Sequence, residues 1–485
     1  MTEYTLYYAT NRNHIGADRW KPKSYGKGFS KDGRENLRFG RVTIRADDKE
    51  IKKYLEFPMD ELGFGNGEKL SSYLADQVKK TGKIAAYKED LIANEPDAYQ
   101  PNAVFGSNQF FNDLKNEMMK STDTLIYIHG YNIDWNNAVG NAIALQVMLN
   151  SVTTGDTVQK VLVVLFTWPS DGSLFPYRAY YSDRKDVEDS GYAVGRALLK
   201  LRDFLTVLME RVRTKQEEFC QQELHLLCHS MGNYVLQNAA RKIKENVLTP
   251  ALPKLFDHVF LCAADVDDNV LEAGQPLERL NELCRSVSVY YNRDDKALML
   301  SDVSKGNPER LGANVAAHPH LLHNKICQID CTDVVTGITQ HSYYLNGSIN
   351  NDIIQSIEGF TQDDPRRQRV TTGELPNVWK MKKNNKEKMI MANSFENIRS
   401  CVRTKVHKFC FSEIQITDEK IGATKINDLH LTQNSHMPGV SPQEALVAQL
   451  KKCVDIQIEL SGDQLKNNSD LTVDDVAALI YAQTV

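Results

Sequence analysis

The chain has no long uninterrupted apolar run. The run of the most strongly apolar side chains, residues 161–166 (Val-Leu-Val-Val-Leu-Phe), has the length of a strand, whereas a membrane-spanning helix needs about 20 apolar residues. The N-terminus lacks the basic region followed by an apolar segment that marks a secretory signal. We therefore expect a protein without a membrane span, located in the cytoplasm.

The sequence also lacks a strong charge excess and a disulfide pattern. The formal net charge is -5 over 485 residues, which gives no whole-chain argument for binding nucleic acid. There are 9 cysteines, an odd number, scattered through segments with strand and helix patterns. Free thiols in a reducing compartment are the simplest interpretation. No metal or organic cofactor is implied.

What the chain does have is an ordinary globular composition, 41% hydrophobic and 25% charged, which can bury a large core. Between residues 121 and 360, short apolar runs alternate with segments whose apolar residues recur at helical spacing. The strand-like runs are residues 124–128, 161–166, 224–227, 258–262, 287–291 and 325–329. This alternation predicts an α/β fold, a mostly parallel sheet with helices on both faces.

The segments on either side of this core differ from it. Residues 1–120 contain strand-like runs, and we expect them to form an N-terminal strand extension packed on the core. From residue 361 the composition shifts to a basic, loop-like stretch, followed by new strand and helix patterns. Residues 361–485 are therefore predicted to form an accessory C-terminal α+β domain beside the catalytic core at residues 121–360.

Residues 228–232 read Cys-His-Ser-Met-Gly and lie where a buried strand meets an amphipathic helix. This is the place of the nucleophile elbow, G-x-S-x-G, of α/β-hydrolases. The sharp turn needs small residues two before and two after the serine; Gly232 fits, and Cys228 is a small replacement. The hydroxyl of Ser230 would then stand at a helix N-terminus, which favours developing negative charge. The alternative is that Ser230 is only a helix N-cap.

A nucleophilic serine needs a base, and the base needs an orienting carboxylate. In this fold the chain order is serine, acid, histidine. Asp295 and His341 both follow predicted strands, at the sheet edge where open α/β folds gather their sites. Asp294 and Asp265 are the alternatives for the acid.

A loop upstream supplies the remaining catalytic element. Residues 129–132 (His-Gly-Tyr-Asn) follow the first core strand, where such hydrolases contribute one N–H group to the oxyanion hole. We assign the two donors to the backbone N–H groups of Tyr131 and Met231. The side chain of His129 is interpreted as a brace for the loop, because only backbone is needed there.

Taken together, these motifs resemble the bacterial α/β-hydrolases of largely uncharacterised function that share an N-terminal Tyr-Ala-Thr-Asn-Arg segment. The matching segments are residues 8–12, 129–132, 166–170, 229–233, 295–298 and 341–344. The resemblance implies the α/β-hydrolase fold and the triad Ser230, Asp295 and His341. It leaves the substrate open, and the C-terminal domain is not part of it.

Two other patterns carry weaker hypotheses. His318, His320 and His323 could bind zinc, but Pro319 precludes helical presentation and a polar loop is favoured. The basic stretch 366–408, which includes Trp379, could contact nucleic acid or anionic headgroups, although such runs are more often solvated surface.

The sequence thus predicts a serine hydrolase acting on a carboxylic ester, small or lipid-like, through an acyl-enzyme. Two alternatives stay open. One is an effector hydrolase of a lipid, amide or peptide, directed by a ligand or protein partner at the C-terminal domain. The other is a catalytically inactive binding module.

Overall fold

The computed structural model describes residues 1–55, 58–59, 63–89, 106–151, 160–170, 176–214, 222–246, 252–298, 309–335, 341–364, 366–373, 375 and 377–382. Most of the predicted accessory domain, residues 361–485, lies outside these ranges. The partner-binding role predicted for that domain therefore stays a prediction. None of the helices in the described ranges combines the length and the apolar character that a membrane crossing requires.

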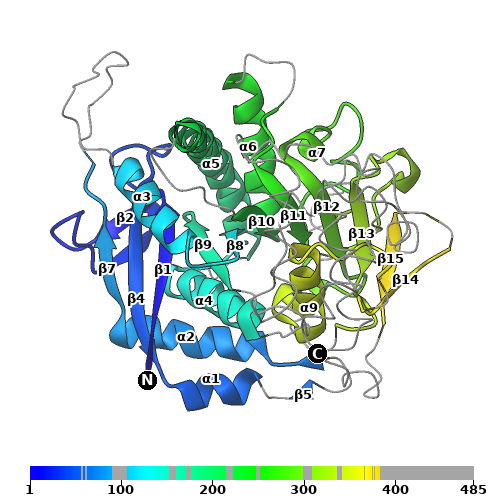
Figure 1. Cartoon of the computed structure of the whole chain (residues 1–485), viewed down its shortest axis with the longest axis horizontal. Coiled ribbons are helices and arrows are strands. Elements are labelled where there is room, and N and C mark those ends of the chain that lie inside the picture. Colours follow the sequence, from blue (N-terminus) through cyan, green and yellow to red (C-terminus); the bar gives the residue numbers. More distant parts are fainter. Residues whose placement is uncertain are drawn as a thin grey trace, which may run out of the picture.

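One 11-stranded sheet organises the protein (Figure 1). Its strands are β1 (Thr2–Thr10), β4 (Arg38–Ala46), β7 (Lys83–Ala86), β8 (Asp123–Ile128), β9 (Val161–Thr167), β10 (Glu223–His229), β11 (Phe256–Cys262), β12 (Cys284–Tyr291), β13 (Ile326–Asp330), β14 (Arg369–Thr371) and β15 (Val378–Met381). Their spatial order is β14-β15-β13-β12-β11-β10-β8-β9-β1-β4-β7. Every neighbouring pair from β15 to β1 is parallel, and only the outer pairs are antiparallel. The predicted mostly parallel sheet is confirmed.

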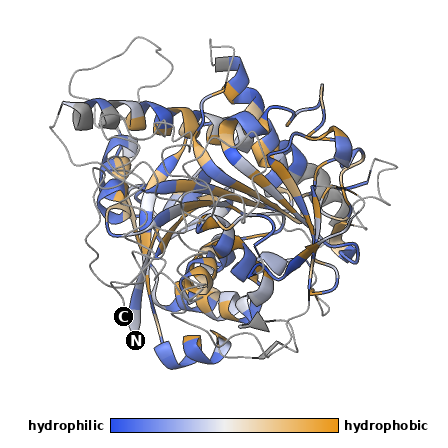
Figure 2. Ribbon diagram, turned by 45° about the vertical axis from the view of Figure 1, so that its right-hand side comes forward, coloured by the Kyte–Doolittle hydropathy of each residue, from blue (hydrophilic) through white to orange (hydrophobic). Residues whose placement is uncertain are grey.

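Helices cover both faces of the sheet, as predicted (Figures 1 and 2). One face carries α3 (Gly106–Met118), α5 (Pro176–Arg213), α6 (Gly232–Asn246) and the short α7 (Leu280–Leu283). The other carries α1 (Asp48–Leu55), α2 (Gly67–Thr81), α4 (Trp135–Ser151) and α9 (Gly347–Ile357). Because strand side chains alternate between faces, Leu226 belongs to one apolar cluster and Leu227 to the other.

Short elements complete the fold. Two small antiparallel pairs are β2 (Arg12–Ile15) with β3 (Ser24–Phe29), and β5 (Pro58–Met59) with β6 (Gly63–Phe64). The 3-10 turns are Pro319–Leu321 and Tyr343–Leu345. At the N-terminal side, β1 pairs with β9 and is followed by β4 and β7, so the N-terminal segment continues the core sheet.

The start of the basic stretch lies inside the core, so the prediction of a solvated loop was wrong there. Arg367 and Arg369 have buried side chains, and both pair with the buried carboxylate of Asp352 at 3.0 and 3.3 Å. The hydroxyl of Tyr290 donates to the same carboxylate (2.7 Å). Trp379 stands in β15 and packs against the apolar cluster. The carboxylate of Asp352, on α9, offsets part of the positive charge of the two arginines and so allows their burial.

We predict that Asp352→Asn lowers the free energy of unfolding by about 3–5 kcal/mol, because it leaves buried guanidinium groups without a counter-charge. Chemical denaturation monitored by circular dichroism measures this loss. The control is Lys53→Met, which breaks the exposed Lys53–Glu50 pair and should leave stability nearly unchanged. Equal effects of the two substitutions would contradict the structural role of Asp352.

Candidate active site

Ser230 occupies a strained turn between β10 and α6. Its φ is +54°, in the left-handed region that non-glycine residues rarely adopt. The Ser230 N–H donates to the Cys262 carbonyl at 2.9 Å, and the Ser230 carbonyl accepts from the N–H groups of Asn233 (3.0 Å) and Asp265 (3.2 Å). These hydrogen bonds hold the turn in a backbone conformation that serine rarely adopts without such constraints. This is the backbone of a nucleophile elbow.

Two glycines let the elbow pack directly against the loop after β8. A Cβ atom on Gly232 would lie 2.6 Å from the Ile128 carbonyl oxygen and 2.8 Å from that of His129. A Cβ atom on Gly130 would lie 2.7 Å from the Cβ of Ser230. Backbone cannot move away cheaply at these distances. The approach of the two loops therefore requires glycine at both positions.

The side chain of Asn233 stabilises the elbow through hydrogen bonds, a role that the sequence analysis did not assign to it. Its Nδ2 donates to the carbonyls of Ser230 (2.9 Å) and Cys228 (3.2 Å). Asn233 is fully buried, so these bonds are formed away from water. Cys228 is also fully buried, and burial raises the pKa of its thiol well above the usual range. It serves as a small apolar residue rather than as a nucleophile.

Asp295 and His341, the predicted acid and base, form a hydrogen-bonded pair. Asp295 follows β12, and its buried carboxylate accepts from His341 Nδ1 through Oδ2 at 2.8 Å. The other oxygen accepts from the backbone N–H groups of Ala297 (3.0 Å) and Leu298 (3.2 Å). The carboxylate is thus fixed in place, and the bond to Nδ1 leaves Nε2 of the partly exposed His341 ring available as a base.

The two alternatives for the acid have other contacts. The side chain of Asp265 lies 3.3 Å from the guanidinium of the buried Arg310. The backbone N–H of Asp294 donates to the side chain of Asn292, in the turn before Asp295. Of the three aspartates considered, Asp295 is the one that the structure pairs with His341.

His341 is tied to His229, the residue before Ser230. His229 Nε2 donates to the backbone carbonyl of His341 at 3.0 Å, and the two rings are 4.9 Å apart. Among the described residues, the Ser230 hydroxyl makes no hydrogen bond to the His341 ring. Catalytic hydrogen bonds are often long without substrate and tighten in the complex. The structure therefore places His341 beside the elbow, without a hydrogen bond between its ring and the Ser230 hydroxyl.

The donors assigned to the oxyanion hole lie on the two loops that pack together. Tyr131 follows Gly130, and Asn132 next to it has a φ of +55°, so the loop turns sharply there. Met231 precedes the first residue of α6, where N–H groups have no partner within the helix. The Met231 N–H has no acceptor among the described residues.

His129 braces this loop, as interpreted from the sequence. Its buried ring contacts the Gly130 carbonyl through Nδ1 (2.8 Å) and the Thr167 hydroxyl through Nε2 (2.9 Å). The ring also stacks on Trp168, whose Nε1 donates to the His129 carbonyl at 3.0 Å. Burial, and then the charge of Arg12, lowers the pKa of His129 well below its usual range. A neutral ring suits a structural role better than proton transfer at neutral pH.

The N-terminal motif supports the same loop, a role that its sequence alone did not reveal. Arg12 is fully buried, and its guanidinium donates to Thr167 Oγ1 (2.8 Å), the Gly26 carbonyl (3.1 Å) and the Ile133 carbonyl (2.6 Å). It thus ties the ends of β1 and β9 to the loop after β8. The nearest sequence signal was the motif at residues 8–12 itself.

Two tyrosines anchor the segment after His341. The Tyr343 hydroxyl donates to the Tyr290 carbonyl (2.7 Å) and accepts from the Ala263 N–H (2.8 Å). The Tyr344 hydroxyl is 2.6 Å from that of Tyr127. Both are buried, so the turn that carries His341 is fastened to the carboxyl ends of β8, β11 and β12.

The histidines considered for zinc do not form a three-ligand group in the described structure. His318 pairs instead with Glu272, at 3.1 Å. The described residues bring together one group of three side chains with metal-ligand chemistry, Asp123, Glu223 and His225. This group lies at the starts of β8 and β10, at the edge of the sheet opposite Ser230.

The pH dependence of stability tests the neutral state of His229. Burial lowers the pKa of His229 to about 3, from 6.5, so this side chain takes up a proton on unfolding at any pH between these values. Stability should therefore fall as the pH drops from about 6.5 toward 3, with a slope of up to about 1.4 kcal/mol per pH unit from this group.

His229→Gln should remove this slope while its amide still offers a donor to the His341 carbonyl. Denaturation at a series of pH values measures the difference between the two proteins. The exposed His320→Gln is the control and should keep the wild-type slope. An identical pH dependence in wild type and His229→Gln would show that His229 is not held neutral.

A comparison with protein-family models agrees with this architecture. The family model described as "Alpha/beta hydrolase of unknown function (DUF900)" matches residues 106–357. A solved structure titled "The crystal structure of the putative cell surface hydrolase from Lactobacillus plantarum WCFS1" is 15% identical, with a TM-score of 0.28, covering 51% of this chain and 96% of that chain. A search of curated proteins found no match.

The matched region spans more than half of the chain and runs from α3 to the end of α9, including the elbow and the acid–base pair. The resemblance seen in the sequence is confirmed: the chain belongs to the α/β-hydrolase family of unknown function, DUF900.

Proposed function

We propose that this α/β hydrolase cleaves carboxylic esters through an acyl-enzyme, with Ser230, His341 and Asp295 as its triad. The observation that carries the proposal is the 2.8 Å bond from His341 Nδ1 to the buried Asp295 carboxylate, beside a serine with a φ of +54°. A fixed base next to a strained hydroxyl is the arrangement that nucleophilic acyl transfer needs.

In the first half-reaction, Ser230 Oγ attacks the ester carbonyl while His341 Nε2 takes the hydroxyl proton. Asp295 orients the ring and stabilises the imidazolium that forms. The N–H groups of Tyr131 and Met231 bind the oxyanion of the tetrahedral intermediate. His341 then returns the proton to the leaving alcohol, and the acyl group stays on Ser230.

In the second half-reaction, water attacks the acyl-enzyme. His341 takes a proton from that water, and the resulting intermediate collapses to release the carboxylic acid. The same proton returns to Ser230 Oγ, which restores the free enzyme. No step needs a metal or an organic cofactor.

Access to the nucleophile favours a small substrate. Ser230 is 5% exposed, so little of its surface is open to solvent. A small or flexible acyl ester can reach such a hydroxyl more readily than an extended polypeptide can. We therefore favour an ester over a peptide as the substrate.

Labelling with a fluorescent fluorophosphonate tests the nucleophile. We expect wild type to label, Ser230→Ala to lose labelling while keeping its circular dichroism spectrum, and the exposed Ser72→Ala to label like wild type. Labelling that persists in folded Ser230→Ala would mean that another residue is the nucleophile.

Ester hydrolysis tests the acid. On p-nitrophenyl esters of increasing chain length, Asp295→Asn should reduce kcat by up to about 10⁴-fold, because the altered hydrogen bond favours the wrong tautomer of His341. Asp265→Asn is the matched control and should retain far more activity. A larger loss in Asp265→Asn than in Asp295→Asn would assign the acid to the other strand.

A further inference from the structure

His229, the last residue of β10, links the elbow to the turn that carries His341. It precedes Ser230 in the chain, and its Nε2 donates to the backbone carbonyl of His341 at 3.0 Å. Its ring also packs against two others, with centroids 4.9 Å from the His341 ring and 4.7 Å from the Tyr344 ring. One buried side chain therefore contacts the proposed base while its own backbone leads into the proposed nucleophile.

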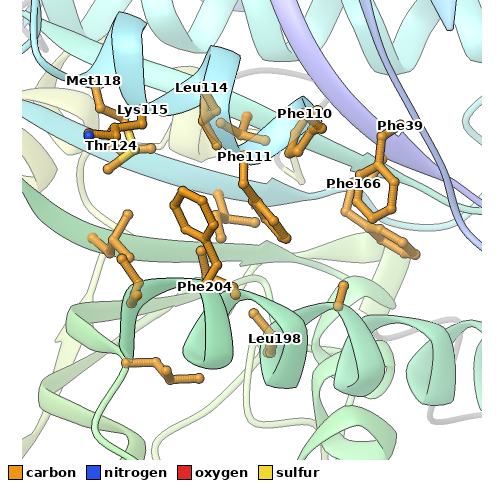
Figure 3. A pocket seen from close by; sticks show the side chains of 18 of the residues that line it. Phe39, Phe110, Phe111, Leu114, Lys115, Met118, Thr124, Phe166, Leu198 and Phe204 are labelled. Atoms are coloured by element: carbon orange, nitrogen blue, oxygen red, sulfur yellow. The ribbon is translucent and has the colours of Figure 1, made fainter. Parts of the chain in front are cut away.

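The ring of His229 lies on the sheet face that carries α4 and α9, where Leu227 and Tyr344 belong to the same apolar cluster. Side chains alternate along a strand, so Leu224 of β10 points to the other face. There it lines an apolar cavity of about 120 Å³ between the sheet and the helices α3 and α5 (Figure 3). A substitution at His229 therefore changes the contacts of the His341 turn and leaves the packing around that cavity intact.

The hydrogen bond to His341 fixes which nitrogen of His229 carries the proton. A carbonyl oxygen can only accept, so Nε2 is the donor, and Nδ1 of the neutral ring is then the bare nitrogen. Nδ1 is buried and has no hydrogen-bond partner. A second proton on Nδ1 would create a charged, buried N–H group with no acceptor, which is costly. The geometry thus favours a neutral ring with a single, defined tautomer.

The surroundings of His229 also oppose a charge on its ring. The titratable groups near it are His341, Tyr344 and, in the loop after β8, His129. Among the residues that the structure describes, no carboxylate pairs with it. Burial, and then the neighbouring His341, lowers the pKa of His229 to about 3. The ring is therefore an uncharged donor at neutral pH.

The contacts of His229 complement the one that Asp295 makes. Asp295 holds the His341 ring through a single hydrogen bond at Nδ1 (2.8 Å), about which the ring can still turn. The side chain of His341 is 26% exposed, so packing alone restrains it weakly. The bond from His229 fixes the backbone of His341, and the contact between the two rings limits rotation of its side chain. Together they restrict the positions that His341 Nε2 can reach.

We infer that His229 is a positioning residue for ester hydrolysis: it holds His341 within reach of Ser230 and, as an uncharged donor, does not oppose the positive charge that His341 acquires in the transition state. The role rests on the proposed function, because it serves the base of that reaction. His229 itself exchanges no proton with the substrate. Small displacements of a catalytic group reduce the rate of the chemical step, so the loss of His229 should affect kcat more than KM.

Steady-state hydrolysis of p-nitrophenyl acetate tests this role, with rates divided by the number of sites that a fluorophosphonate labels at completion. His229→Leu lacks the donor and should lower kcat about 10–100-fold with little change in KM. His229→Gln keeps an uncharged donor and should recover most of the lost kcat.

His225→Leu is the matched control, because it removes another fully buried histidine from the same face of β10, near the opposite end of the strand. It should keep the wild-type kcat even if the protein becomes less stable. Equal kcat in wild type and His229→Leu, or an equal loss in His225→Leu, would overturn the positioning role.

The pH profile tests the uncharged state of His229 during catalysis. The acid limb of kcat/KM reports the base of the free enzyme. Because His229 is already neutral, His229→Gln should leave this limb at its wild-type position. If His229 carried a charge, removing it would raise the pKa of His341 and move the limb to higher pH. Such a shift would overturn the inference, and the measurement remains decisive if His229→Leu does not fold.

A measurement that needs no activity separates this role from the proposed function. The His341 Nδ1 proton, bonded to Asp295, should give a downfield proton resonance in the NMR spectrum that Asp295→Asn removes. We expect the resonance in wild type and His229→Gln, and its broadening or loss in His229→Leu. Wild type that neither labels nor hydrolyses esters would overturn the proposed function. An unchanged resonance in folded His229→Leu would instead overturn the role of His229.

Discussion

The proposed active site depends on the contact between two backbone turns at the carboxyl end of the sheet. The loop after β8 and the elbow after β10 approach so closely that a Cβ atom on Gly130 would overlap the Cβ of Ser230, and one on Gly232 would overlap backbone. This approach holds Ser230 at a positive φ and sets the N–H groups of Tyr131 and Met231 on adjoining turns. Close packing leaves neither turn room to relax, so the strain at Ser230 is maintained by its surroundings.

The rest of the site supports these two turns through buried polar networks. On one side, Arg12 and His129 join the ends of β1 and β9 to the loop after β8. On the other, Tyr343 fastens the His341 turn to the ends of β11 and β12. His229 connects the elbow to that turn. Such fully buried networks are stabilising only when their members are paired, which makes them specific for one arrangement.

Much of this could be predicted from the sequence, because local patterns carry it. Apolar runs alternating with helical periodicity predicted the parallel sheet, and the strand–Ser230–helix junction predicted the elbow. Position after a strand left Asp294 and Asp265 open as alternatives to Asp295, which the family resemblance implied. The fold shows the carboxylate of Asp295 beside His341 and that of Asp265 beside Arg310. It also misjudged Arg367, because its buried partner, Asp352, lies on a helix and no local pattern links them. Polar pairs between residues far apart in the chain could not be predicted from the sequence.

The most direct test of the central claim is the structure of the protein after reaction with a phosphonate ester. We expect phosphorus bonded to Ser230 Oγ, with the phosphonyl oxygen accepting hydrogen bonds from the N–H groups of Tyr131 and Met231. His341 Nε2 should then lie within hydrogen-bond distance of an adduct oxygen. An adduct on another residue, or a phosphonyl oxygen directed away from both N–H groups, would contradict it.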